Sequence, residues 1–165
     1  MTRRAAGRRG RHLVAALCLL PVMVLPDAAA ADPALQLLDD GGAVLAQLPM
    51  REGAEICLRW SHSVTGGAVA DCFENRAGQL TLTRSFLHDF AAGLGEVAGR
   101  GRLVSAPRGG YWIVDINEAM PANSLNLRNG SDRVGHILAA AGQELPLSDY
   151  VARGARVSLH LNLHP

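Results

Sequence analysis

The sequence predicts a mainly β domain, a small β-sandwich or a partly open barrel with one or two short helices. Beyond residue 31, turn signals built from Gly, Asp and Asn recur about every eight to twelve residues, as they do in all-β domains. The last apolar run, residues 157–163, alternates apolar and polar side chains, which is the pattern of a strand with one buried face. Many short strands with few helices favour a sandwich or a barrel.

In the N-terminal half of the domain we expect strands joined by tight turns. The Asp-Asp-Gly-Gly segment at 39–42 predicts one hairpin turn, and Gly66-Gly67 predicts another. Ile56, Leu58 and Trp60 lie at alternate positions and therefore share one face of their strand. The expected strands are residues 35–38, 44–48, 55–64, 68–73 and 80–86.

The C-terminal half is less regular. Residues 88–110 are rich in glycine and predict a long irregular connection, a kind of segment that is usually functional or disordered. Residues 134–141 predict one or two helical turns, and residues 147–152 a second short helix that Gly154 would end. The remaining strands are expected at residues 111–116, 125–128 and 157–163.

The first 31 residues carry the features of a cleavable secretory signal peptide. Five arginines without an acid precede an apolar run from Leu13 to Leu25, and small residues follow from Ala28 to Ala31. The run has about 13 residues, fewer than the roughly 20 that span a bilayer, which favours cleavage over a retained membrane anchor. We therefore expect one exported domain at residues 32–165, located in the periplasm.

The charge of the expected mature domain argues against one class of partner. Without residues 1–31 the chain keeps 11 Arg, no Lys and 14 acidic residues, a net charge of about −3. Neutralisation of phosphates dominates nucleic-acid affinity, and a mildly acidic domain without a basic stripe supplies little of it. We expect no nucleic-acid partner, and the sequence points to no cofactor.

Two cysteines, Cys57 and Cys72, remain after the signal segment. In an oxidising compartment an even pair is interpreted first as a disulfide. The loop that it would close, about 15 residues, gives a stabilisation of about 3 kcal/mol in the chain-entropy model. The alternative is two buried free thiols that pack as small hydrophobic residues.

The densest polar cluster lies around the turn at Gly66-Gly67. If the flanking strands form a hairpin, His62 and Asp71 lie near its mouth on facing strands. A carboxylate fixes the tautomer of an imidazole and raises its basicity, so this pair could bind a metal, act as a general base or hold a ligand. The alternative is a structural hydrogen bond. Ser63 does not predict a hydrolase, because consecutive strand residues face opposite sides.

Further candidates lie later in the chain. The segment from Phe86 to Gly95, which includes Gly93, ends in small residues that let a ligand or another chain approach, unless it is an ordinary crossover. Arg128 could clamp a carboxylate or simply be solvated, and His136 adds a polar group. Metal binding is an open alternative without a specific signal, because the ligand types are present but no two have zinc-motif spacing: His62, Asp71, His88, His136 and His160.

A set of short motifs resembles the DUF1850 family: His62-Ser63-Val64, Val69, Asp71, Phe86, Ala92-Gly93-Leu94, His136 and the segment Gly154 to Leu159. The most specific part is the His-Ser-Val tripeptide with an acid nine residues after the His. The sequence departs from the family pattern in two places. Around the turn it lacks a Pro near Ala68 and has Asp rather than Glu at position 71, and residues 91–95 stand where the family has Gly-Ala-Gly-Leu-Pro. Members are small exported bacterial proteins, commonly encoded beside tripartite TAXI/TRAP-type permeases, so the resemblance implies a context of solute uptake and no mechanism.

Together these features lead us to expect a non-enzymatic periplasmic accessory or ligand-binding protein of such a transporter. Its partners would be a small anionic solute, or the permease or solute-binding protein. The expected ligand-binding residues are His62, Ser63, Asp71, Phe86, Gly93, Arg128 and His136. The alternative is a metal-dependent or acid/base enzyme that uses the His62/Asp71 pair.

Overall fold

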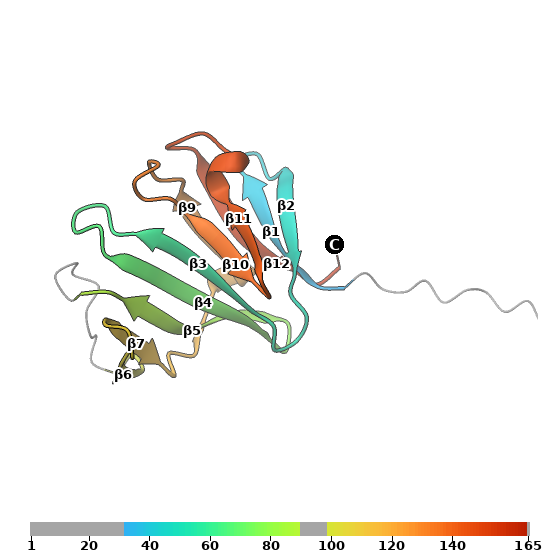
Figure 1. Cartoon of the computed structure of the whole chain (residues 1–165). Helices are drawn as coiled ribbons and strands as arrows, with labels where there is room; N and C mark the ends of the chain where they lie inside the picture. Colours follow the sequence, from blue (N-terminus) through green and yellow to red (C-terminus); the bar gives the residue numbers. More distant parts are fainter. Residues whose placement is uncertain (1–31, 90–98, 165) are drawn as a thin grey trace, which may run out of the picture.

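The computed structural model describes residues 32–89 and 99–164, which form a mainly β fold of two antiparallel sheets (Figure 1). The sheets do not close into a barrel, so the chain adopts the sandwich of the two predicted architectures. The predicted signal peptide at residues 1–31 and Gly93 lie outside the described residues. Within the described ranges, no helix has both the length and the apolar character that crossing a membrane requires.

The small sheet brings the two ends of the domain together in the strand order β2-β1-β12-β9. The Asp39–Gly42 turn joins the first two strands as predicted: Asp39 Oδ1 accepts hydrogen bonds from the backbone N–H groups of Gly41 and Ala43 at 2.9 and 2.8 Å. The strands are β1 (Ala34–Asp39), β2 (Val44–Pro49), β9 (Ser124–Arg128) and β12 (Arg156–Asn162).

The large sheet has the order β11-β10-β3-β4-β5-β7-β6, with the short β8 paired to β5. Its central strands are the longest, and β3, β4 and β5 lie side by side in Figure 1. The strands are β3 (Glu55–Ser61), β4 (Ala68–Arg76), β5 (Gln79–Leu87), β6 (Arg102–Ser105), β7 (Tyr111–Val114), β8 (Glu118–Ala119), β10 (Ile137–Ala140) and β11 (Gln143–Pro146). Two short 3₁₀ helices complete the fold, η2 (Pro121–Asn123) and η3 (Leu147–Asp149).

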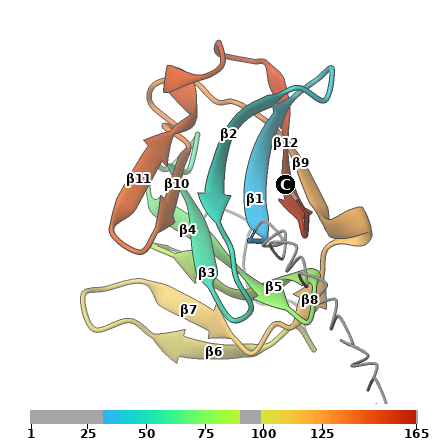
Figure 2. The ribbon, with the colours of Figure 1, turned by 90° about the vertical axis from the view of Figure 1, so that its right-hand side faces the viewer.

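One hydrophobic core lies between the sheets, because each strand turns alternate side chains inward. The terminal strand shows this most clearly: Val157, Leu159 and Leu161 are at most 3 % exposed. In Figure 2 the strands of the small sheet lie side by side, and β6 and β7 run across their direction. The large sheet contributes mainly aliphatic side chains to the same core: Ile56, Leu58, Phe73, Leu80, Leu82 and Leu138.

A strand is found at each expected place, but β3 ends at Ser61 rather than residue 64 and β7 at Val114 rather than residue 116. Two other predictions also need correction. The helix expected at residues 134–141 is wrong, because this segment holds β10. Its Leu138 lies opposite Leu58 on β3 and Leu145 on β11, and all three are buried, which a helix there would not achieve. The connection expected at 88–110 is not irregular throughout, since it contains β6. A short helix is found where residues 147–152 predict one, but η3 ends at Asp149, well before Gly154.

Candidate functional site

The outward face of the large sheet is hollowed along β4. The ladders place Ala70 between Arg59 on β3 and Phe86 on β5, and residues directly opposite each other point to the same face of a sheet. Ala68 and Cys72 lie two positions to either side of Ala70 and therefore share its face. These small side chains lie between larger ones and leave an open hollow of about 800 Å³.

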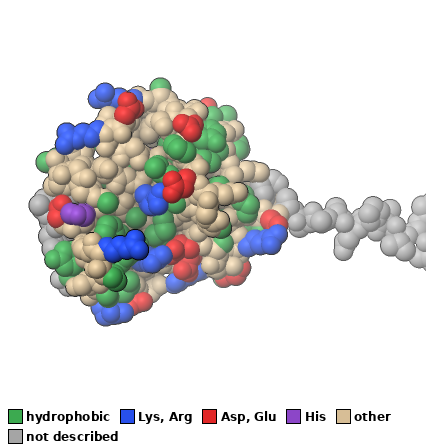
Figure 3. Space-filling model, viewed as in Figure 1, with side chains coloured by type: hydrophobic (Ala, Val, Ile, Leu, Met, Phe, Trp, Pro, Cys, Tyr) green, Lys and Arg blue, Asp and Glu red, His purple; other side chains and the backbone are tan. Residues whose placement is uncertain are grey.

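We call this hollow the β4 groove. Its floor consists of Ala68, Ala70 and the Cys57–Cys72 disulfide, and its walls include Arg59, Phe86, His88, Arg108 and Trp112. Figure 3 shows a face of the molecule on which green hydrophobic side chains lie between blue arginine side chains. The groove therefore combines apolar surface with positive charge.

The predicted disulfide forms the centre of the groove floor. Cys57 and Cys72 are joined and lie directly opposite each other in the β3–β4 ladder, with their Cα atoms 4.0 Å apart. Their sulfur atoms and a carboxylate oxygen of Glu55 form the one group of three potential metal ligands within 4.8 Å among the described residues. Metals bind the thiolate form of cysteine, and disulfide sulfurs cannot adopt it. This cluster is therefore structural.

Two aromatic rings make one wall of the groove. The ring centroids of Phe86 and Trp112 are 5.3 Å apart and their planes are tilted by 57°, which is a favourable arrangement for an aromatic pair. The β6–β7 turn lies on this pair because Gly110 has no side chain: a Cβ there would lie 2.6 Å from Phe86 Cζ. The same turn carries Arg108 to the rim of the groove.

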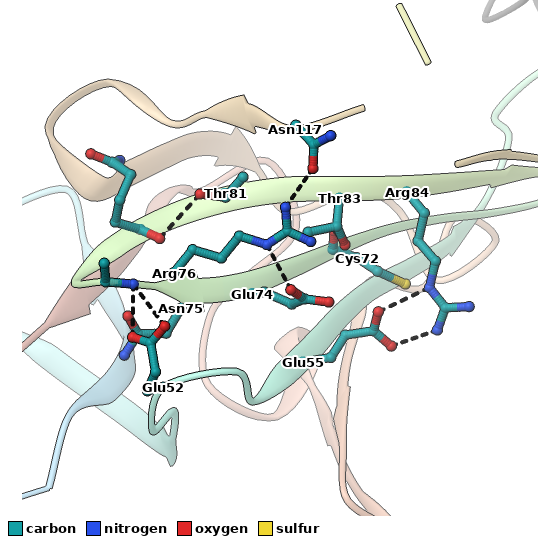
Figure 4. A network of polar contacts seen from close by, with 12 residues as sticks. Glu52, Glu55, Cys72, Glu74, Asn75, Arg76, Thr81, Thr83, Arg84 and Asn117 are labelled. Atoms are coloured by element: carbon teal, nitrogen blue, oxygen red, sulfur yellow. Dashed lines mark hydrogen bonds and ion pairs between the residues drawn. The ribbon is translucent and has the colours of Figure 1, made fainter. Parts of the chain in front are cut away.

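An ion pair spans β4 at one end of the groove. Glu55 on β3 accepts two hydrogen bonds from Arg84 on β5, at 2.9 and 2.5 Å, beside Cys72 (Figure 4). The Arg84 guanidinium also lies 4.5 Å from the centroid of the Trp112 ring, a cation–π distance. The groove is thus bounded by polar groups at this end. Its other end lies toward the turn at residues 62–67, where Ser61, Ala68 and His88 line it.

Among the described residues, the groove lining contains basic side chains and no acidic ones. Arg59, Arg108 and His88 belong to it, whereas no Asp or Glu of the described residues does. Arg59 already donates a hydrogen bond to Glu144 at 2.5 Å. Arg108 is exposed and makes no ion pair within residues 32–89 and 99–164. Arg108 is therefore the cation best placed to meet an anionic ligand.

The predicted His62/Asp71 pair is not formed. Asp71 lies opposite Leu58 in the β3–β4 ladder and faces inward between the sheets. Leu58 is four residues before His62 in the sequence, so the ladder does not bring His62 to Asp71. Its Oδ1 accepts a hydrogen bond from Ser85 Oγ at 2.5 Å, while burial raises the pKa of its carboxyl. His62 Nδ1 instead accepts from the backbone N–H groups of Val64 and Thr65, both at 3.3 Å. The ladder register is the physical reason for the separation.

The other predicted ligand-binding residues are scattered. Ser63 is exposed in the turn after β3. His136 Nδ1 accepts from the backbone N–H of Gly130 at 3.1 Å, its ring lies 6.0 Å from that of Trp60, and burial lowers its pKa. Of the predicted residues that the structure describes, only Phe86 lines the β4 groove, together with the two predicted cysteines.

Arg128 lies in a different hollow, of about 570 Å³, on the small sheet. It faces Arg156 across the β9–β12 ladder and donates a hydrogen bond to the carbonyl oxygen of Gly154 at 3.1 Å. Asp39 and Asp40 line the same hollow and supply matching negative charge. This surface is less suited to an anion than the β4 groove, whose lining has no acid within residues 32–89 and 99–164.

Several groove residues escaped the sequence-based prediction: Arg59, Ala68, Ala70, Arg108 and Trp112. One signal was present, the small residues Ala68, Ala70 and Cys72 at alternate positions of a predicted strand. Such a stripe predicts a depression only when the neighbouring strands carry large side chains at the matching ladder positions. That pairing comes from the register.

The fold and the groove define a disulfide-linked β-sandwich with an open, positively charged surface groove. The family model described as "Domain of unknown function (DUF1850)" matches residues 56–147, more than half of the chain, and the chain belongs to this family. Every residue that lines the β4 groove lies within the matched segment. Comparisons with curated proteins and with solved structures give no match.

Proposed function

We propose that the protein works in the periplasm as a non-enzymatic binding module that takes a small organic anion into the β4 groove. The lining of the groove carries this proposal, since it joins Phe86 and Trp112 to two arginines, with no acid in the part of the lining that the structure describes. Ligand sites are typically concave and mostly apolar, with a few polar groups that orient the ligand. Within this site Arg108 supplies the charge that an anion needs.

Two observations support work outside the cytoplasm. The Cys57–Cys72 disulfide fits an oxidising compartment, because disulfides are rare where thiols are kept reduced. The N-terminal basic and apolar segments fit a secretory signal. Both support export, and neither names a partner.

The geometry around the predicted pair supports a non-enzymatic role. General acid–base catalysis by a histidine usually relies on a second group that orients the imidazole. His62 and Asp71 have separate partners, so this unit is not assembled among the described residues. This geometry therefore disfavours an acid/base enzyme that uses the pair.

The transporter part of the proposal follows from the gene context that membership of the family implies. In this proposal the module is an accessory of a tripartite TAXI/TRAP-type transporter and acts with the permease or the solute-binding protein. Cross-linking of the exported protein in its own cells, followed by mass spectrometry, tests it. We expect one of these transporter proteins among the linked partners, and linkage to neither of them overturns this part.

A ligand screen tests the binding part. The full chain, exported by a bacterial host and purified from the periplasm, would be heated with monocarboxylates, dicarboxylates, amino acids and phosphates. At least one anion should raise Tm, because a ligand that binds only the folded state stabilises it. Ala70→Leu should remove the shift by filling the groove, whereas Ala119→Leu, on exposed β8, should keep it. A Tm rise that survives in Ala70→Leu would place the ligand elsewhere.

A further inference from the structure

The shape and the charge layout of the β4 groove together define a narrower class of ligand than a small anion. We propose, as a refinement that rests on the proposed function, that the groove takes a slender monocarboxylate. Its apolar body lies along Ala70 and the disulfide, and its carboxylate meets Arg108. Three features of the groove lead to this assignment: its width, its apolar lining and the placement of its charges.

The floor sets the width. Arg59 and Phe86 stand on β3 and β5, which are two strand spacings apart, about 9.5 Å between backbone lines. The wall side chains take up part of that distance, so the space above Ala70 fits one hydrocarbon chain or the edge of one ring. Along β4 the floor extends about 13 Å, from the exposed Ala68 to the fully buried Cys72, which sets an upper limit on the length of the body. A branched or bulky group at this point of the groove would meet Arg59 and Phe86.

The lining sets the chemistry of the body. Phe86 and Trp112 are only partly buried, and Pro107 and Ile137 add apolar surface around the same hollow. Covering these groups removes apolar area from water, which favours a ligand with a hydrocarbon body over a fully polar one. Acetate, which has a carboxylate and almost no body, should therefore bind weakly.

The charges set the orientation and the number of carboxylates. At the bounded end, Arg84 is already paired with Glu55, so its guanidinium is not free to receive a second carboxylate there. At the rim, Arg108 has no ion-pair partner among the described residues and presents a guanidinium fork that matches a carboxylate. One carboxylate at the rim is favoured, and a second one at the far end is penalised.

Calorimetric titration of the exported full chain with four probes, which differ in carboxylate number and in hydrocarbon length, tests the assignment. Hexanoate should bind at least tenfold more tightly than adipate, which adds the second carboxylate, than hexan-1-ol, which lacks any, and than acetate, which lacks the body. Arg108→Gln should weaken hexanoate binding about tenfold, while Arg153→Gln, an exposed arginine outside the groove, should not change it. Ala70→Leu should abolish it and Ala119→Leu should preserve it.

The outcomes separate this inference from the function on which it rests. If adipate, an amino acid or phosphate binds best and Ala70→Leu blocks it, the groove is an anion site and the monocarboxylate assignment is wrong. Equal binding of hexanoate and hexan-1-ol, or an unchanged affinity in Arg108→Gln, also overturns the assignment. If no anion shows binding that Ala70→Leu removes, both the assignment and the proposed function fail.

Discussion

Removal of the Cys57–Cys72 disulfide gives the most quantitative prediction. The bond closes a loop with a sequence separation of 15, for which the chain-entropy model gives about 3 kcal/mol at 25 °C. A melting entropy of roughly 2.1 cal/mol/K per residue over residues 32–165 converts this into a fall in Tm of about 10 °C. The two cysteines already face each other in the ladder, so the double Cys57→Ala/Cys72→Ala variant keeps its native strand pairing.

Calorimetry of the exported protein with and without reductant measures this effect. Wild type should lose about 10 °C on reduction, while the double alanine variant should melt near the reduced wild type and ignore reductant. Mass spectrometry of alkylated protein reports the thiol content in parallel. Two free thiols in freshly exported protein, or a double variant as stable as oxidised wild type, would refute the reasoning.

Three further predictions concern buried groups and one glycine. Burial raises the pKa of Asp71, so the stability that this side chain contributes is fully present below its unfolded pKa and is lost as pH rises. The Tm difference between Asp71→Asn and wild type should therefore grow from pH 4 to pH 7. A constant difference would contradict this. Burial lowers the pKa of His136, so wild type should lose stability as pH falls below about 6.5, and His136→Gln should flatten that loss; parallel pH profiles would count against it. Gly110→Ala should destabilise the fold more than Gly109→Ala, by about 1 to 3 kcal/mol. Both glycines have a positive φ, 80° and 89°, but only at Gly110 would a Cβ lie 2.6 Å from Phe86 Cζ. Equal Tm values for the two variants would contradict this.

Local patterns in the sequence were enough to predict most of the fold. Strict alternation in β12 and the Asp39–Gly42 turn depend on neighbouring residues, and both behave as expected. The helix predicted at residues 134–141 is wrong because the four residues of β10, Ile-Leu-Ala-Ala, favour helix as much as strand when taken alone. Pairing with Leu58 and Leu145 decides the matter, and these partners are distant in sequence.

The candidate site was harder to predict because it depends on register. His62 and Asp71 flank one turn and look like partners in the sequence, yet the ladder places Asp71 opposite Leu58 on the inward face. The groove arises because strand pairing places the small Ala70 between the large side chains of Arg59 and Phe86 on the two neighbouring strands. No spacing along the chain encodes that match.

The central claim, that the β4 groove binds a slender monocarboxylate, is tested most directly by nuclear magnetic resonance. The chain has two tryptophans, so each indole N–H gives an assignable signal. Titration with hexanoate should shift the Trp112 indole and the backbone amide of Ala70 along one saturable curve, and leave the Leu159 amide of the small sheet unmoved. Saturable shifts that centre instead on Arg128 and Arg156, with Trp112 unaffected, would contradict the claim.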